Sequence, residues 1–228
     1  MQRFLARLED IQIPRTAGEL AGFRDWACSD DFPENGRIDF LDGEIEVDMS
    51  PEELGIHGLV KAEIAAVLQF LVARKGIGNV YIDRGRVSNP AANLSVEPDI
   101  VVVFWDTIDA GRTFNVPSKR RPGRFVEMEG SPDLVVEIVS DGSVRKDLIR
   151  LPPLYAKAGI PELWLVDARG ETIRFEIHRL VAGRYEIGSS DAEGWIASPR
   201  LGWRFRLQRR EVRPGRWSYR LEHKAGRP

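Results

Sequence analysis

The chain has one cysteine, Cys28, among its 228 residues. A single thiol excludes an internal disulfide framework. The N-terminal region has no apolar run long enough for a signal peptide or a membrane span, so we expect a cytoplasmic protein without a membrane partner. The sequence also lacks internal repeats and low-complexity tracts. Composition therefore favours one ordinary globular core.

The chain has almost no net charge, with 33 Lys and Arg against 35 Asp and Glu and a formal charge of -2. This balance gives no overall attraction to nucleic acid, so any such binding must use a local basic surface. A phosphate-binding glycine loop, a GxSxG elbow and a cysteine nucleophile context are also missing. These absences disfavour a small-molecule α/β enzyme, which we keep as a third hypothesis.

The apolar content is sufficient for one sizeable core, since 43% of the residues are hydrophobic and 30% are charged. We expect a single domain over residues 1–228. Its core would span about residues 33–207, and a basic hairpin or tail would occupy residues 208–228.

The segment 131–167 predicts the centre of an α/β fold. Leu134–Val139 is rich in β-branched residues, as in a strand that is buried on both faces. Leu148–Ala158 has a helical pattern that Gly159 ends, and Leu163–Val166 predicts the next strand. Pro152-Pro153 suggests that the helix begins later or is locally broken.

Other elements follow from periodicity and turn signals. Asp42-Gly43 between two alternating runs predicts a hairpin over Arg37–Val47. A long helix is expected over Glu52–Lys75, with Ser50 as its N-cap and Pro51 in its first turn. The remaining predictions are a short helix around Ala17–Asp25 with Thr16 as N-cap, strands at Val80–Ser88 and Val96–Trp105, a loop over Thr107–Gly130, and antiparallel strands at Thr172–Leu180, Arg184–Ile187 and Trp203–Leu207.

Two carboxylates stand out in buried strands. Glu137 interrupts an apolar strand, where an ionised group costs several kcal/mol unless a cation or hydrogen bonds compensate it. Asp99 lies at the start of another buried strand, directly after Pro98. We expect the two acids on adjacent strands, as a hard oxygen site for Mg²⁺ or Mn²⁺ that supports phosphodiester hydrolysis.

Two polar residues of the long helix have open interpretations. His57 lies in its first turns, where a lone histidine is more often a surface or packed side chain than a base. Glu63 lies between Val60 and Val67 on a face that should point inward, so it is either a buried acid with a partner or a partly exposed one. Glu44 and Glu46 could have a catalytic role, but alternate acids on a hairpin usually form its solvent-exposed face.

Two basic segments could contact phosphates. The loop with Lys119, Arg120 and Arg121 is one, although a solvated charge run is the more frequent outcome. The C-terminal tail interleaves arginines with Trp217 and Tyr219, as nucleic-acid surfaces do. An edge hairpin that turns at Pro214-Gly215 explains its alternation without a ligand.

The chain resembles a known family at these residues. VEPDIVVVF around Asp99, PDLVVEIVS around Glu137 and YAKAGIPELWLVD look like the Uma-type restriction endonuclease family of the PD-(D/E)XK nuclease superfamily. The likeness covers about Pro33 to Leu207 and includes RIDFLDGEIEVDMSPEE and IHGLV. It implies a restriction-endonuclease-like fold with a mixed β-sheet flanked by helices, a divalent metal at Asp99 and Glu137, and often a dimer.

The sequence departs from the family pattern at two positions. The family usually opens the long helix with a Glu-His pair, and here Ile56 replaces the glutamate while His57 remains. The family lysine, four residues after the aspartate matched by Asp147, is Leu151. Glu63 could compensate for the first change, and Lys146 or Arg150 could supply charge for the second.

The leading hypothesis is therefore a metal-dependent endonuclease that acts on DNA, impaired if the two replacements are not compensated. The rival is a catalytically inactive nuclease fold that binds DNA or a protein. The candidate catalytic residues are Asp99, Glu137, Lys146, His57 and Glu63, and the candidate DNA-binding residues are Lys119, Arg120, Arg121 and Arg150.

Overall fold

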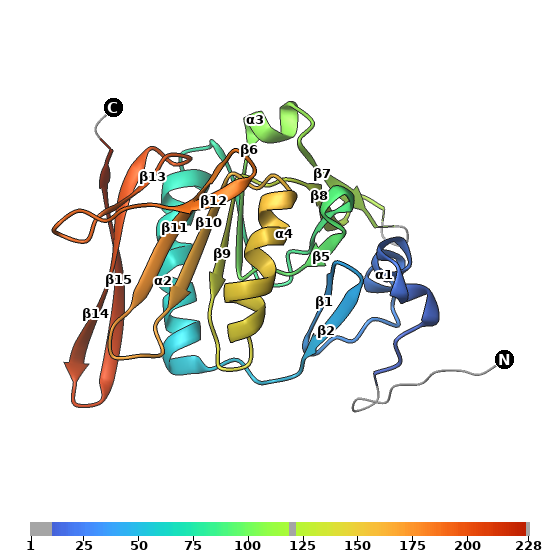
Figure 1. Cartoon of the computed structure of the whole chain (residues 1–228), viewed down its shortest axis with the longest axis horizontal. Coiled ribbons are helices and arrows are strands. Elements are labelled where there is room, and N and C mark those ends of the chain that lie inside the picture. The colour runs from blue at the N-terminus through green and yellow to red at the C-terminus, as the bar shows by residue number, and fades with distance from the viewer. Residues whose placement is uncertain (1–10, 119–121, 227–228) are drawn as a thin grey trace.

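The computed structural model describes residues 11–118 and 122–226 and has a six-stranded mixed sheet at its centre (Figure 1). The strand order is β12-β11-β10-β9-β6-β3, with β9 and β10 parallel and the other neighbours antiparallel. The strands are β3 (Gly78–Ile82), β6 (Ile100–Phe104), β9 (Leu134–Ile138), β10 (Glu162–Asp167), β11 (Arg174–Val181) and β12 (Arg184–Ile187).

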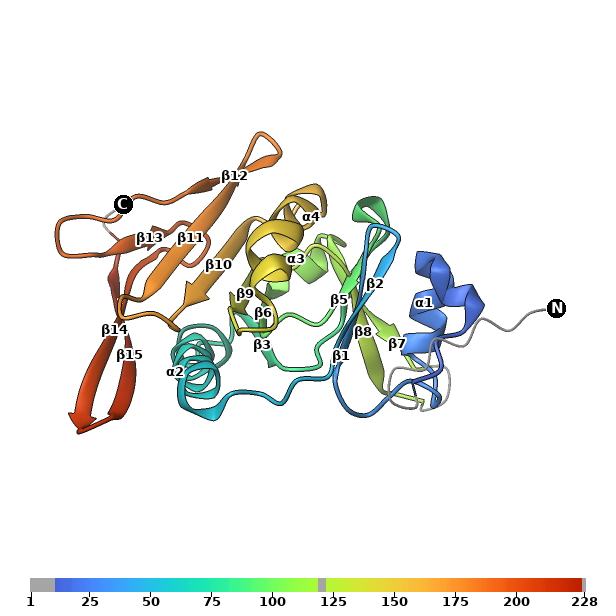
Figure 2. The ribbon, with the colours of Figure 1, turned by 60° about the horizontal axis from the view of Figure 1, so that its bottom comes forward.

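Two further sheets flank the centre (Figure 2). One has the order β2-β1-β5-β4-β8-β7, and the other has the order β13-β14-β15. Their strands are β1 (Arg37–Leu41), β2 (Glu44–Asp48), β4 (Val87–Asn89), β5 (Leu94–Val96), β7 (Thr113–Pro117), β8 (Phe125–Gly130), β13 (Ile196–Ser198), β14 (Trp203–Arg213) and β15 (Arg216–Ala225).

Four α-helices complete the described part of the chain, and irregular turns lengthen two of them. They are α1 (Leu20–Ala27), α2 (Leu59–Leu68), α3 (Trp105–Asp109) and α4 (Leu151–Lys157). π-Helical turns at Leu54–Gly58 and Gln69–Ala73 extend α2, and another at Lys146–Arg150 leads into α4. Short 3₁₀ turns lie at Arg15–Gly18 and Pro90–Ala92.

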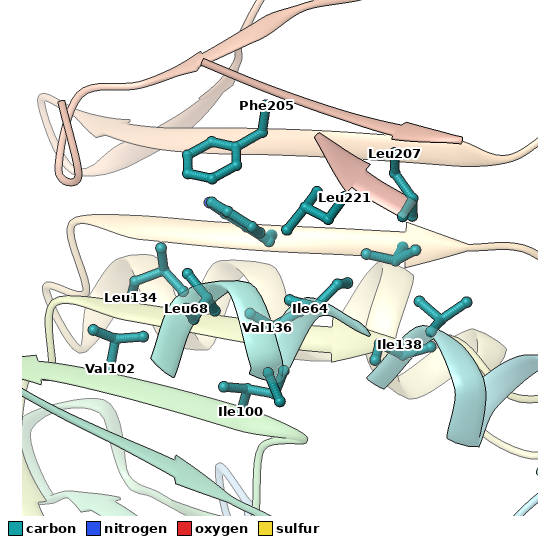
Figure 3. Packing of buried hydrophobic residues seen from close by; sticks show 14 of the residues in the cluster. Ile64, Leu68, Ile100, Val102, Leu134, Val136, Ile138, Phe205, Leu207 and Leu221 are labelled. Atoms are coloured by element: carbon teal, nitrogen blue, oxygen red, sulfur yellow. The ribbon is translucent and has the colours of Figure 1, made fainter. Parts of the chain in front are cut away.

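The two faces of the central sheet bury different partners because side chains alternate along each strand. Val102, Leu134 and Val136 face α2 and the β14-β15 hairpin (Figure 3). Val101 and Val135 face α4 and the sheet that contains β1. Asp99 and Glu137 lie an even number of residues from Val101 and Val135 along the same two segments, so their side chains are on the face of the sheet that α4 covers.

The long helix is confirmed over Leu54–Ala73, but its predicted cap was wrong. The side chain of Glu53, rather than that of Ser50, accepts hydrogen bonds from the backbone N–H groups of Gly55, Ile56 and His57. By length and composition alone this helix could cross a membrane. In the structure Val60 is fully buried with other α2 residues against the central sheet, as in the core helix of a globular protein.

The hairpin predictions at both ends of the chain are confirmed. β1 pairs with β2 through Asp42 and Gly43, whose φ angles of 51° and 95° suit a type I′ turn. β14 pairs with β15 along nearly their whole length and turns at Pro214-Gly215. The strand predictions at the centre, in β9 and β10, are also confirmed.

Several predicted boundaries were wrong for local reasons. Val80–Ser88 is two strands in different sheets, because Asp83 and Arg84 adopt positive φ angles of 50° and 48° that break an extended run. Val96–Trp105 is divided into β5 and β6 at Pro98. Thr107–Gly130 contains α3, β7 and β8 rather than only a loop.

The predicted helix boundaries near Thr16 and Pro152 also needed correction. The cap position of α1 is Glu19, not Thr16, and the helix begins at Leu20. Pro152 and Pro153 do not break α4, since they occupy its first turn, where proline is tolerated.

Candidate active site

Asp99 and Glu137 lie side by side where β6 and β9 meet. The antiparallel register pairs Ile100 with Val136, which sets Asp99 opposite Glu137 on the same face of the sheet. Both carboxylates are buried, with residue exposures of 0% and 1%. The structure thus brings together the two acids that the sequence singles out.

Asp99 is held by donors from three parts of the chain. Its Oδ1 accepts a hydrogen bond from Arg37 in β1 at 2.8 Å, and its Oδ2 accepts one from the Ile138 backbone N–H at 2.8 Å. His57 Nε2 lies 3.4 Å from Oδ2. Burial alone would raise the pKa of Asp99, but His57 and Arg37 outweigh it and hold the pKa well below its usual range. Asp99 is therefore ionised.

His57 lies between two carboxylates. Its Nδ1 is 3.0 Å from Oε1 of Glu52, while its Nε2 faces Asp99. Burial lowers the pKa of His57, but the hydrogen bonds and charges of Asp99 and Glu52 outweigh this and raise it. Both ring nitrogens face carboxylates, and this arrangement favours the protonated form of His57.

Glu137 has the opposite electrostatic environment. The hydroxyl of Tyr155 in α4 donates to its Oε1. Burial, followed by the negative charges of Asp147 and Asp99, raises the pKa of Glu137 well above its usual value. Its ionised form therefore needs added positive charge, and a bound cation would supply it.

Lys146 points into this cluster from the π-helical turn before α4. Its Nζ is 3.0 Å from Oδ2 of Asp39 in β1, and the side chain is 3% exposed. Burial would lower the pKa of Lys146, but the carboxylates of Asp39 and Glu137 outweigh it and raise the pKa. Lys146 is a buried cation beside the acid pair, as the compensation hypothesis requires.

Asp147 is a third buried acid next to this pair. Ser143 donates its hydroxyl to Oδ2, while Oδ1 is buried without a hydrogen-bond partner in the described structure. Burial raises the pKa of Asp147 from 3.8 to about 6. Asp147 therefore binds more protons in the folded than in the unfolded chain between about pH 4 and pH 6.

This shift predicts a pH-dependent stability. Because the folded-state pKa is raised, the free energy of unfolding should fall as pH rises from about 4 to about 6, by at most about 3 kcal/mol from this group. Asp147→Asn should remove that component. Thermal unfolding of both proteins at pH 4, 5, 6 and 7 without added metal tests this, and parallel curves would contradict it.

Other residues of this cluster could not be identified from the sequence, because only the tertiary fold brings them to the acid pair. Arg37 and Asp39 alternate along β1, a pattern that reads as an ordinary strand. Lys61 lies one helical turn after His57 and forms ion pairs with Glu52 at 2.5 Å and Asp83 at 2.7 Å. The i, i+4 spacing of His57 and Lys61 is the one local signal that could have found it.

Some predicted residues do not join the cluster. Glu63 accepts a hydrogen bond from the Leu221 N–H in β15 at 2.9 Å, so its helical face packs against the C-terminal hairpin. Arg150 forms ion pairs with Glu44 at 2.8 Å and Glu46 at 2.5 Å on β2. The predicted DNA-binding residues Lys119, Arg120 and Arg121 lie outside the described residues.

A pocket of about 480 Å³ lies beside this cluster, and the buried Asp99, Glu137 and Lys146 are not among the residues that line it. Arg37 and His57 are part of its wall. The acidic lining residues outnumber the basic ones and are Asp48, Glu52, Glu53, Asp83, Glu97 and Asp141. Such a lining attracts a cation more readily than it attracts a phosphate.

The donor set suits a hard divalent ion in part. Asp99 and Glu137 offer oxygens from neighbouring strands, and the positive charges of Lys146 and Arg37 do not offset the burial and acidic neighbours that raise the pKa of Glu137. Within residues 11–118 and 122–226, no group of three His, Cys, Asp or Glu side chains forms a preassembled metal site. Mg²⁺ commonly uses one or two carboxylates together with waters and substrate phosphates, so the pair fits that ion.

A mixed sheet flanked by helices, with two buried acids on adjacent strands and a buried lysine beside them, defines a restriction-endonuclease-like protein. The sequence matches the family model Uma2, described as "Putative restriction endonuclease", over residues 20–213. The chain belongs to this family, which supports a nuclease function. The resemblance noted in the sequence is thereby confirmed.

A solved structure has the same fold. It is described as the crystal structure of a "putative nuclease belonging to DUF820" from Anabaena variabilis. The TM-score is 0.57 at 18% sequence identity, and the match covers 80% of this chain and 90% of that chain. No curated protein matches this chain.

Proposed function

We propose that this protein is a metal-dependent endonuclease that hydrolyses DNA phosphodiester bonds. The observation that carries the proposal is the buried pair of carboxylates, Asp99 and Glu137, set opposite each other by the β6-β9 register. The pair would hold Mg²⁺ or Mn²⁺. The family supports the nuclease activity, while the metal and the DNA substrate are our inference.

The chain's own residues have distinct roles in this proposal. Asp99 and Glu137 bind the metal, which supplies an activated water and charge stabilisation when it is present. Lys146 stays protonated beside Glu137 and stabilises negative charge on the reacting phosphate. Arg37 and His57 fix the orientation of Asp99 and keep it ionised.

One observation favours the alternative of a nuclease fold that binds without cleaving. Both oxygens of Asp99 already accept hydrogen bonds from Arg37 and the Ile138 N–H, so protein cations neutralise this acid without a metal. In that case Arg37 takes the place that a metal would have, and the protein binds DNA or a protein partner.

Titration calorimetry with Mn²⁺ and nicking of supercoiled plasmid separate the two functions. We expect Mn²⁺ binding and nicking that EDTA abolishes. DNA binding that is indifferent to metal, with no nicking at any Mg²⁺ or Mn²⁺ concentration, would favour the binding module and reject the enzyme. The oligomeric state, for which we propose a dimer, is measured on the same samples by light scattering.

A further inference from the structure

The hairpin of β14 and β15 concentrates positive charge on a chain that has little overall. Residues 203–225 include eight Lys and Arg and two Glu, whereas the whole chain has 33 Lys and Arg and 35 Asp and Glu. The remainder of the chain is therefore acidic, and so is the pocket of the candidate active site. Within the described part of the chain, a polyanion therefore finds a locally favourable charge at the hairpin.

The hairpin is attached firmly to the protein. Phe205, Leu207 and Leu221 on its inner face are buried in the core (Figure 3), and so is Tyr219. Phe205 contacts Trp164, with ring centroids 4.7 Å apart. The turn between β14 and β15 extends past the body of the protein in both ribbon views (Figures 1 and 2). The hairpin is thus a fixed arm with a buried base and an exposed tip.

Four arginines in the half of the hairpin nearer its turn are available to a ligand. Arg210, Arg213, Arg216 and Arg220 are exposed and form no ion pair with any described residue, and we call them the arm arginines. Arg206, nearer the base, is already paired with Glu222 at 2.6 Å. Beside them Trp217 is 43% exposed, and the guanidinium of Arg209 lies 4.7 Å from the centre of its ring. Arginine beside an exposed aromatic ring is typical of nucleic-acid surfaces.

The arm is linked to the edge of the sheet where the candidate active site opens. Arg209 donates to the backbone carbonyls of Ala168, at 3.3 Å, and Glu171, in the segment that follows β10. Arg169 of the same segment forms an ion pair with Asp141 at 3.0 Å, and Asp141 lines the pocket. β9 and β10 run parallel, so both strands end at this edge.

We propose that the arm arginines bind the phosphate backbone of DNA beside the active-site pocket. The choice of DNA rests on the proposed function, whereas the anion-binding surface rests on the hairpin itself. An acidic metal site needs a separate basic surface to hold a polyanion, and this arm supplies it on the same edge. The family match ends at Arg213, at the hairpin turn, so β15 with Arg216 and Arg220 lies outside the matched residues.

The test is DNA binding by the full chain in EDTA, which removes cleavage from the measurement. Fluorescence anisotropy with a labelled 24-base-pair duplex is measured at several salt concentrations. The test variant is R210Q/R213Q/R216Q/R220Q. The matched control, R74Q/K75Q/K157Q/R184Q, removes the same charge from four other exposed positions.

The test variant should bind the duplex about 10- to 100-fold more weakly at moderate salt. The slope of log K against log salt should become shallower by about 0.9 for each lost phosphate contact. The control should stay within about threefold of the wild type. Equal weakening in both variants would reduce the effect to net charge and overturn the proposal, as would wild-type binding by the test variant or an absence of duplex binding by the wild type.

This measurement is independent of catalysis. Weakened binding with no plasmid nicking in the wild type would support the arm and reject the endonuclease. Nicking in the wild type with unchanged duplex binding in the test variant would do the reverse.

Discussion

Glu137→Gln should abolish metal-dependent plasmid nicking while leaving the protein at least as stable as the wild type. The loss of nicking should be on the order of 10²- to 10³-fold or more, because the variant removes one of two charged ligands for the cation. Stability should not fall, because burial raises the pKa of Glu137 and the neutral amide removes a charge that the folded site holds at a cost. Urea unfolding and nicking assays on the same preparation measure both effects.

Asp99→Asn is the matched comparison, since it makes the same chemical change on the neighbouring strand. It should also abolish nicking, but it should lower the free energy of unfolding by about 3 kcal/mol, because Arg37 and His57 lose their buried counter-charge. Both substitutions should thus abolish nicking, but only Asp99→Asn should lower the free energy of unfolding. Equal stability changes would contradict the charge distribution described here, and nicking by either variant at the wild-type rate would reject the metal site.

Lys146→Met should abolish nicking and destabilise the protein by about 3–5 kcal/mol. The buried carboxylate of Asp39 would lose its cation, at 3.0 Å in the wild type, and an uncompensated buried charge costs about this much. Lys157→Met, in α4, is the control, because the Lys157 side chain is 53% exposed and its removal should cost less than about 1 kcal/mol.

A double variant separates the structural effect of Lys146 from its chemical effect. Lys146→Met with Asp39→Asn removes both members of the ion pair and should recover most of the stability. Nicking should stay absent, because the cation beside Glu137 is still missing. If nicking returned together with stability, Lys146 would be only a structural partner of Asp39.

The sequence predicts the strand framework of the site well, because that framework depends on local patterns. β9 is a run of β-branched residues, and β6 follows a proline that sets its start, so the placement of Asp99 and Glu137 on neighbouring strands could be expected. The positions of the cations around these two acids could not be predicted from the sequence. Arg37 is 62 residues from Asp99 in the chain, and Lys146 is 107 residues from Asp39.

The long helix shows why residue faces were harder to predict than the helix itself. Glu63 lies on an apolar face, and the sequence does not reveal whether that face meets the acid pair or the C-terminal hairpin. His57 and Lys61 share another face, near the helix start, and this is the one that meets Asp99. Only the packing of β15 against α2 decides between them, and that contact is non-local.

The π-helical turn before α4 explains how a lysine can occupy this site although Leu151 stands where the family resemblance implies one. In a π turn the backbone bond joins residues five apart, and here the Leu151 N–H bonds to the carbonyl of Lys146. Lys146 therefore lies one turn before Leu151 and close to the same side of the helix, and both residues are buried. A widened turn thus lets the ammonium group come from an earlier position along the chain while it still faces the acid pair.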